Sequence, residues 1–277
     1  MERKISAVTV SVIREEMQAA DTEKLPAFVK QYENDARAGV QALVKRARRQ
    51  VMALEKEKKR TEAMQAYEKK YGQYTYICGI DEVGRGPLAG PVVAGAVILP
   101  KNCDILYLND SKQLSAKKRE ELYDIIIEKA VSVGLGFVSP ERIDEINILQ
   151  ATYEAMRQAI SALTVKPDLL LNDAVTIPQV EIRQIPIIKG DAKSISIAAA
   201  SIVAKVTRDR MMTDYDTVLP GYGFAANKGY GSQEHIAALR KLGPSPIHRK
   251  TFIKNISGSG VDQPGGEQSG QDRDQGR

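Results

Sequence analysis

The stretch Ile80-Asp81-Glu82-Val83-Gly84-Arg85-Gly86-Pro87-Leu88-Ala89-Gly90-Pro91 is the most informative part of this chain. It follows an apolar, β-prone run, residues 74–80, which predicts a strand that ends near the two acids. Neighbouring side chains of a strand point to opposite faces, so Asp81 and Glu82 can share one site only if the strand ends or bends there. The glycines that follow allow such a bend. Converging carboxylates repel each other, and a divalent metal ion is the usual way to hold them together; a charged turn is the alternative for this pattern alone.

Three further acids are candidates for the same site. Asp173 follows the apolar run 168–172, which is typical of a buried parallel strand, and α/β folds place their chemistry at the carboxyl ends of such strands. A helix N-cap or a turn residue is the alternative role for Asp173. Asp191 lies between a strand end and a helix start, where a helix N-cap is the alternative role. Asp110 precedes a helix whose N-cap we expect to be Ser115, so a turn residue is the favoured interpretation.

Grouped carboxylates with almost no histidine indicate a hard metal ion. The chain has only two histidines, His235 and His248, and neither lies in an acidic motif, so no zinc site is predicted. Carboxylate oxygens suit Mg²⁺ or Mn²⁺. Two such ions about 3.5–4 Å apart catalyse phosphoryl transfer, one activating a water molecule and the other stabilising the departing oxygen.

The segment 192–214 reads as a helix rich in small residues, which allows close packing on a sheet. Ser201, Lys205 and Arg208 are spaced so that they share one face of this helix. A stripe of hydroxyl and cationic groups suits phosphate oxygens. A packed helix whose cations reach out to solvent is the alternative.

Composition places the chain among globular proteins of a reducing compartment. It has 277 residues, 43% apolar and 27% charged, and two cysteines without metal-ligand spacing. No apolar run approaches the roughly 18 residues of a membrane span, and no secretion signal is evident. We therefore expect a cytoplasmic protein without membrane contact.

The two ends of the chain differ from its middle. Residues 1–70 hold 16 of the 40 Lys and Arg but 11 of the 35 Asp and Glu, so they carry the whole net charge of +5. They read as a helical, basic extension, including a helix entered at Pro26 and a long one from Ala36, whose charged face suits phosphates or is simply solvated. Residues 257–277 are too polar to bury a core, and we expect a disordered tail.

The middle of the chain predicts an α/β domain with a mixed sheet. An antiparallel meander comes first and parallel crossovers follow. The expected strands are 74–80, 91–99, 131–138, 168–173 and 181–188. The expected helices are 115–130, about 140–163, 192–214 and 232–242.

Over residues 74–250 the chain resembles the bacterial ribonuclease HII family. The motifs that carry the resemblance are Gly79–Val93, Asn109–Leu114, Lys189-Gly190-Asp191, Ile197–Asp209 and Lys228-Gly229-Tyr230-Gly231. The resemblance implies an RNase H-like fold over 74–255, a five-stranded mixed sheet flanked by helices and followed by a helical part. It implies a monomeric endonuclease that hydrolyses RNA in RNA–DNA hybrids and nicks 5′ of single ribonucleotides in duplex DNA, leaving 5′-phosphate and 3′-hydroxyl ends. Ribonucleotide removal and primer clearance would be its tasks.

The resemblance also assigns roles to residues. Asp81, Glu82, Asp173 and Asp191 would bind Mn²⁺ or Mg²⁺ as the catalytic acids, although the segment around Asp173 matches loosely. The turn Gly84-Arg85-Gly86 would contact the ribonucleotide 2′-hydroxyl, which is the group that distinguishes RNA from DNA. Tyr230 would stack under the sugar at the RNA–DNA junction. Further substrate contacts are expected from Lys112, Ser201, Lys205 and Arg208, while Asp110 falls outside the metal set.

Two alternatives remain from the sequence. The first is a sister ribonuclease that needs several consecutive ribonucleotides, against which the Gly-Arg-Gly turn and Tyr230 argue. The second is a nucleic-acid-binding protein without catalysis, driven by the basic extension, against which the set of acids argues.

Overall fold

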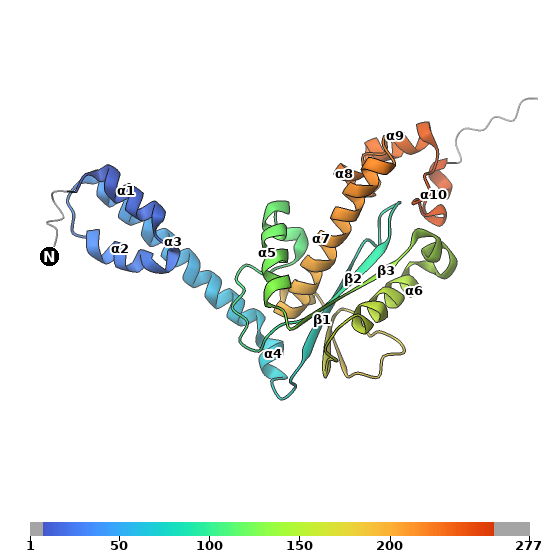
Figure 1. The fold of residues 1–277 in the computed structure, drawn as a ribbon, viewed down its shortest axis with the longest axis horizontal. Helices are drawn as coiled ribbons and strands as arrows, with labels where there is room; N and C mark the ends of the chain where they lie inside the picture. The colour runs from blue at the N-terminus through green and yellow to red at the C-terminus, as the bar shows by residue number, and fades with distance from the viewer. Residues whose placement is uncertain (1–7, 258–277) are drawn as a thin grey trace, which may run out of the picture.

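A five-stranded mixed sheet forms the centre of the molecule (Figure 1). The computed structural model describes residues 8–257, so the predicted tail lies outside the described residues except for its first position. The strands are β1 (Ile77–Val83), β2 (Val92–Ile98), β3 (Ser132–Val138), β4 (Leu169–Asp173) and β5 (Gln184–Ile187). Their order is β3-β2-β1-β4-β5, with β1–β2 and β2–β3 antiparallel and β1–β4 and β4–β5 parallel. The predicted meander followed by parallel crossovers is confirmed.

Helices cover both faces of the sheet. On one face α7 (Ile195–Val218) lies along β1 and β2, with α5 (Ala116–Lys129) beside it, and on the other α6 (Pro140–Ser161) packs on β2 and β3. Glycines allow α7 to approach closely: a Cβ atom on Gly79 would lie 2.0 Å from the backbone of Ser196, and one on Gly95 would lie 2.6 Å from the Ala200 carbonyl. The small residues of α7 therefore do what the sequence predicted.

Several boundaries differ from the prediction by a few residues, and three of these differences have a structural reason. β1 does not end before the acids but continues through them, with Asp81 opposite Gly95 and Glu82 opposite Ala94. α7 begins at Ile195 rather than at residue 192, because Ser194 is its N-cap. β5 is shorter than predicted and lies at the sheet edge, where Pro186 is tolerated because its missing N–H faces no partner strand.

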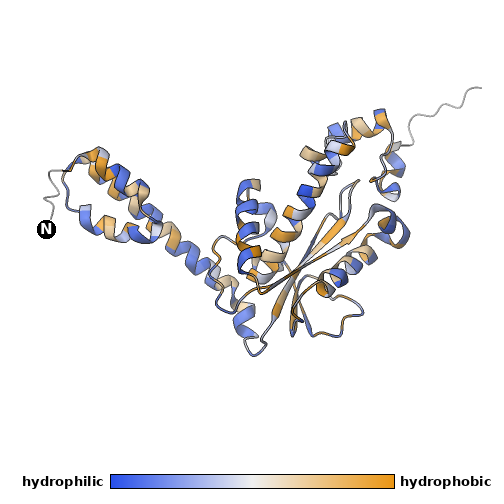
Figure 2. Cartoon of the chain, in the orientation of Figure 1, coloured by the Kyte–Doolittle hydropathy of each residue, from blue (hydrophilic) through white to orange (hydrophobic). Residues whose placement is uncertain are grey.

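The N-terminal extension folds as a helical head with its own core. The head consists of α1 (Val10–Ala19), the short η2 (Thr22–Lys24), α2 (Leu25–Tyr32) and the first half of α3 (Ala38–Met64). α4 (Ala66–Lys70) follows α3 and lies against the body (Figure 1). The apolar faces of α1, α2 and α3 meet around Ile13, Phe28 and Val44, which are buried. Figure 2 shows the alternation of apolar and polar residues along these helices. The predicted first-turn proline, Pro26, lies at the start of α2.

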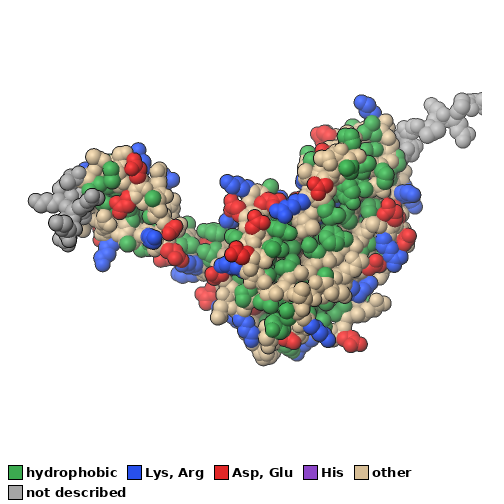
Figure 3. Space-filling model, viewed as in Figure 1, with side chains coloured by type: hydrophobic (Ala, Val, Ile, Leu, Met, Phe, Trp, Pro, Cys, Tyr) green, Lys and Arg blue, Asp and Glu red, His purple; other side chains and the backbone are tan. Residues whose placement is uncertain are grey.

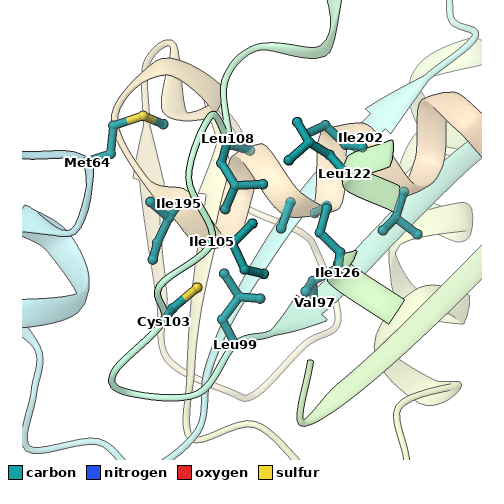
Figure 4. Close-up of a cluster of buried hydrophobic side chains, with 14 of the residues drawn as sticks. Met64, Val97, Leu99, Cys103, Ile105, Leu108, Leu122, Ile126, Ile195 and Ile202 are labelled. Atoms are coloured by element: carbon teal, nitrogen blue, oxygen red, sulfur yellow. The ribbon is translucent and has the colours of Figure 1, made fainter. Parts of the chain in front are cut away.

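The second half of α3 joins the head to the body, as the narrow neck in Figure 3 shows. α3 has 27 residues, or about 40 Å at 1.5 Å per residue. Its last residue, Met64, is 4% exposed and belongs to the hydrophobic core formed by α5, α7 and the face of the sheet that they cover (Figure 4). Arg60 also donates to the Leu108 carbonyl at 2.7 Å, and Gln65 to the Cys103 carbonyl at 3.0 Å. The extension is therefore built into the body.

The chain after α7 forms a helical C-terminal part. It contains α8 (Phe224–Asn227), α9 (Gln233–Leu242) and α10 (Lys250–Ser257), which lie near the carboxyl end of α7 (Figure 1). Among residues 8–257, no helix is both long and apolar enough to span a bilayer.

Candidate active site

A cavity of about 500 Å³ lies at the carboxyl end of β1. Its walls come from the end of β1, the turn that follows, the short helix η3 (Ser111–Gln113), the middle of α7 and the turn before α9. Most of the residues predicted for the site line it, namely Asp81, Glu82, Gly84, Arg85, Gly86, Lys112, Ser201, Lys205 and Tyr230. Asp173, Asp191 and Arg208 do not line it.

The sheet opens beside Asp81 and Glu82. The pairing of β1 with β4 stops at Ile80 opposite Asn172, so Asp173 is the next residue on β4 where β1 carries Asp81. Asp81 points toward α7 and is 6% exposed. The predicted bend of the strand is thus unnecessary: the two acids alternate along β1, and because β1 and β4 are no longer paired beyond Ile80, both acids interact with Asp173.

Burial and mutual repulsion act on the two acids of β1. Burial, then the charges of Glu82 and Asp173, raise the pKa of Asp81 well above its usual range, while hydrogen bonding with Ser201 opposes the rise. Burial also raises the pKa of Glu82, although Arg85, whose Nη1 lies 3.3 Å from Glu82 Oε1, opposes it. The ionised pair is costly without a cation close by.

The other two predicted acids lie close together: Asp173 is the last residue of β4, and Asp191 lies shortly after the end of the neighbouring strand β5. Asp173 Oδ1 accepts a hydrogen bond from the Gly190 N–H at 2.7 Å. Asp191 follows in the short helix η4 (Gly190–Ala192), and its pKa is raised by burial and then by the charges of Asp110 and Asp173. Ser194 caps α7, so Asp191 is not the helix N-cap that the sequence allowed.

Asp110 has the role that the sequence favoured for it. Its carboxylate accepts a hydrogen bond from the Lys112 N–H at 2.9 Å and caps η3, and Ser115 caps α5. Its charge still reaches Asp191. Asp110 is therefore a helix cap that also lies close to the acidic group.

The donor set fits a hard divalent cation by its chemistry. It consists of carboxylates; burial, together with the charges of neighbouring acids, raises the pKa of Asp81, Glu82 and Asp191, and a bound cation would offset both effects. As the side chains stand, no three acidic, histidine or cysteine side chains in residues 8–257 are grouped closely enough to hold a metal ion. Glu82 faces Arg85 and Asp173 faces the Gly190 amide instead.

Two buried arginines donate hydrogen bonds to the backbone carbonyls of the loop from Gly84 to Pro91. Arg208 donates to the carbonyls of Ala89 and Pro91 at 3.1 and 2.9 Å, and Arg249 donates to the carbonyls of Arg85 and Gly90 at 2.8 and 3.0 Å. Both side chains are 0% exposed, and burial lowers the pKa of each. Gly84 has φ +90°, which favours glycine, and a Cβ there would lie 2.3 Å from Arg208 Nε. The turn is therefore fixed tightly.

Arg208, predicted to contact the substrate, does not line the cavity. Its side chain is fully buried and its donors are used by backbone carbonyls, including that of Lys228 at 2.9 Å. Ser201 and Lys205 of the same helix do line the cavity, and Lys205 Nζ lies 2.7 Å from Asp209 Oδ1. The helical spacing was right, but the Gly84–Pro91 loop covers the position of Arg208.

Tyr230 is the exposed aromatic side chain of the cavity, at 41% exposure. Its turn is bonded to the loop opposite: the Gly229 carbonyl accepts from the Leu88 N–H at 2.8 Å. A Cβ on Gly229, which has φ +83°, would lie 2.4 Å from the Ala89 carbonyl. The tyrosine and the Gly84–Pro91 loop thus form one backbone unit.

Sequence reasoning missed three residues behind this unit: Arg249, His235 and His248, all at most 3% exposed. The only sign in the sequence was that two polar residues, His248 and Arg249, are adjacent in a short loop segment. Residues of this kind are seldom buried without a partner, so their burial could be predicted only if their partners were known. The partners are backbone carbonyls and another histidine, which no spacing rule reveals.

Known proteins share both parts of this chain. A family model described as Ribonuclease HII matches residues 78–255, and one described as Ribonuclease HII N-terminal domain matches residues 9–72. The chain is 69% identical over 226 residues to the ribonuclease HII of Lachnoclostridium phytofermentans, covering 82% of this chain and 89% of that one. It is 50% identical over 250 residues to that of Clostridioides difficile, covering 90% and 98%.

Solved structures agree with the sequence relatives. The ribonuclease H2 of Pyrococcus horikoshii superposes with a TM-score of 0.56 at 30% identity, covering 66% of this chain and 97% of that one. The RNase HII of Archaeoglobus fulgidus, solved in a complex with PCNA, gives 0.55 at 28% identity, covering 67% and 98%. On its fold and its sequence, this chain belongs to the ribonuclease HII family.

Proposed function

We propose that this chain is a metal-dependent endonuclease that hydrolyses RNA paired with DNA and nicks on the 5′ side of a single ribonucleotide in duplex DNA. The observation that carries the proposal is the composition of the cavity: Asp81 and Glu82 lie beside the Gly84-Arg85-Gly86 turn and the exposed Tyr230. The acids supply the means of cutting, and the turn and tyrosine supply the means of recognising the sugar. Membership of the family supports the same reaction.

Asp81, Glu82, Asp173 and Asp191 are the proposed metal-binding and catalytic acids. A bound Mg²⁺ or Mn²⁺ would activate water and offset the charge of the departing 3′ oxygen. In this arrangement the buried Asp81 is held in place by the backbone N–H of Glu82, at 2.8 Å, and Asp173 by that of Gly190, at 2.7 Å. Arg85 would have to release Glu82 for the acid to bind a metal ion.

The remaining cavity residues are proposed to orient the substrate. The glycine turn offers backbone groups that a 2′-hydroxyl can approach closely. The Tyr230 ring offers an apolar face for the sugar, and Lys112 and Lys205 lie where they can meet phosphate oxygens. Each contact concerns the sugar or the backbone, so cleavage should depend little on base sequence.

A duplex DNA with one embedded ribonucleotide tests the proposal directly. Incubation with Mg²⁺ or Mn²⁺ should give a nick 5′ of the ribonucleotide, leaving a 3′-hydroxyl on one fragment and a 5′-phosphate on the other. A chain that binds this duplex without cutting it under any metal would refute the proposal. A substrate with four consecutive ribonucleotides distinguishes this activity from that of an enzyme which cuts only the longer run.

We also propose that the extension binds the duplex away from the cut. Lys45, Arg49, Lys56 and Lys59 recur at helical spacing on α3, are exposed, and have no ion-pair partner in the described part of the chain. They form a stripe about 21 Å long, a length over which duplex DNA presents many phosphates. The monomeric state and cytoplasmic location expected from the sequence remain predictions.

A further inference from the structure

Two histidines face each other beneath the Tyr230 turn. His235 on α9 and His248 before α10 are 0% and 3% exposed, and their Nε2 atoms lie 3.0 Å apart. His235 Nδ1 lies 2.8 Å from the Tyr230 carbonyl oxygen. Neither imidazole lines the cavity, so neither touches the substrate itself.

The hydrogen bonds around this pair fix where each proton lies. The Ser245 N–H donates to His248 Nδ1 at 2.9 Å, so that nitrogen carries no proton. A neutral His248 is then protonated at Nε2 and donates to His235 Nε2. His235 must therefore be protonated at Nδ1, and this N–H donates to the Tyr230 carbonyl. The three hydrogen bonds therefore all donate in the same direction, from Ser245 through His248 and His235 to the Tyr230 carbonyl.

The surroundings keep both rings neutral. Phe224 lies 5.3 Å from the His235 ring and 5.7 Å from the His248 ring, centroid to centroid, and Tyr222 lies 5.1 Å from His248. Burial lowers the pKa of His235, and burial followed by the charge of His235 lowers the pKa of His248 to about 4. At neutral pH the tautomers are therefore those that the hydrogen bonds require.

The segment Ser245–Arg249 is linked by hydrogen bonds to both parts of the proposed sugar-binding site, Tyr230 and the Gly84-Arg85-Gly86 turn. Through His248 and His235 it reaches the Tyr230 carbonyl, and through Arg249 it reaches the carbonyls of Gly84, Arg85 and Gly90. His248 also pairs with Ala89 as an isolated β-bridge. This one segment thus lies behind the turn and behind the tyrosine.

We propose that His235 and His248 are positioning residues that hold Tyr230 at its working distance from the Gly84-Arg85-Gly86 turn, and so contribute to the selection of a single ribonucleotide. The inference rests on the proposed function. The histidines act only through Tyr230, so they should matter most for substrates whose RNA–DNA junction the tyrosine meets.

Two variants of His235 isolate the bond to Tyr230. The side-chain amide of Asn can take the place of Nδ1 and keep the donor to the carbonyl, whereas that of Gln takes the place of Nε2 and loses it. His235→Gln should lower kcat/KM on a single-ribonucleotide duplex about tenfold, the loss expected for one net hydrogen bond of about 1 kcal/mol or slightly more. His235→Asn should retain most of the activity. On a uniform RNA–DNA hybrid both variants should stay near wild type.

A double-mutant cycle with Tyr230→Ala separates positioning from general stability. If His235 acts through Tyr230, His235→Gln should have no further effect on cleavage by Tyr230→Ala. Full additivity of the two losses, or equal losses on both substrates, would overturn the inference. Thermal unfolding identifies a variant that fails to fold; should His235→Gln do so, His248→Gln against His248→Phe repeats the test, because Gln keeps the Nε2 donor.

The wild-type protein is the reference that keeps the two proposals apart. If it cuts neither substrate, the proposed function fails. If it cuts the single-ribonucleotide duplex and His235→Gln shows the wild-type preference between substrates, only the positioning role fails.

Discussion

At the scale of single residues, Asp81 is a proposed metal-binding acid whose burial also has a cost in stability. Asp81→Asn should reduce cleavage by more than the roughly 100-fold typical of losing an outer partner of a metal site. It should leave binding of the duplex largely intact, because the cations and the turn of the cavity are unchanged. Without metal the variant should be at least as stable as wild type, because it removes a repelled, buried charge. Single-turnover cleavage, filter binding and thermal unfolding measure the three effects.

Asp110→Asn is the matched control for that variant. Each change replaces one acid by its amide: Asp81 beside Glu82 and Asp173, or Asp110 beside Asp191. Asn caps a helix as well as Asp does, so η3 should keep its geometry in Asp110→Asn. Cleavage by Asp110→Asn should stay close to wild type. A loss as large as that of Asp81→Asn would place Asp110 among the catalytic acids and contradict the assignment made above.

His248 should make the fold sensitive to acid. Its pKa is about 4 in the fold against an ordinary 6.5, so the unfolded chain binds the proton more tightly. The stability that comes from keeping this ring neutral is fully present above pH 6.5. It is lost as the pH falls from 6.5 to 4, by up to about 3 kcal/mol at 1.36 kcal/mol per pKa unit. Urea unfolding at pH 7 and pH 5 should show this loss in the free energy of unfolding, and His248→Gln should reduce the difference between the two pH values. If the variant loses as much stability between pH 7 and pH 5 as the wild type does, His248 is not the group responsible.

At the scale of elements, α4 and α7 are joined by one carboxylate. Glu68 accepts from the Ser194 hydroxyl at 2.6 Å and from the Ser196 N–H at 3.1 Å, so an acid from the extension completes the N-cap of α7. Glu68→Ala should lower the free energy of unfolding by about 1–2 kcal/mol, as the loss of a helix cap does. Glu62→Ala, which removes only the exposed pair with Lys69, should cost far less. Equal effects in urea unfolding would show that this cap is unimportant.

The elements also show how far the sequence led and where it stopped. Apolar runs and caps predicted all five strands and the order of antiparallel and parallel pairing, because alternation and chain direction are local properties. The position of Arg208 could not be predicted, because helical spacing says which residues share a face but not which loop covers that face. The two histidines were missed for a similar reason, since their partners lie far along the chain or on the backbone. Asp81 and Glu82 were found, but not how an uninterrupted strand brings them to one site.

At the scale of the whole molecule, the extension cannot be removed as a unit. Met64 belongs to the core of the body and Glu68 caps α7, so deleting residues 1–70 would damage the catalytic part as well as the basic surface. Loss of activity in such a deletion would therefore say little about phosphate binding. The charge stripe on α3 has to be tested with the backbone left in place.

Changing Lys45, Arg49, Lys56 and Lys59 together to Gln tests the stripe. If all four contact phosphates, the slope of log binding constant against log salt should fall by as much as about 3–4, at roughly 0.9 per phosphate of duplex DNA. KM should rise at low salt while kcat changes little, because the cavity is untouched. As a control, Arg48 and Lys58 on the same helix already pair with Glu33 and Glu23, so changing them to Gln should alter the slope less per charge removed. A slope equal to that of wild type in the fourfold variant would mean that α3 is a spacer and that its cations only keep it solvated.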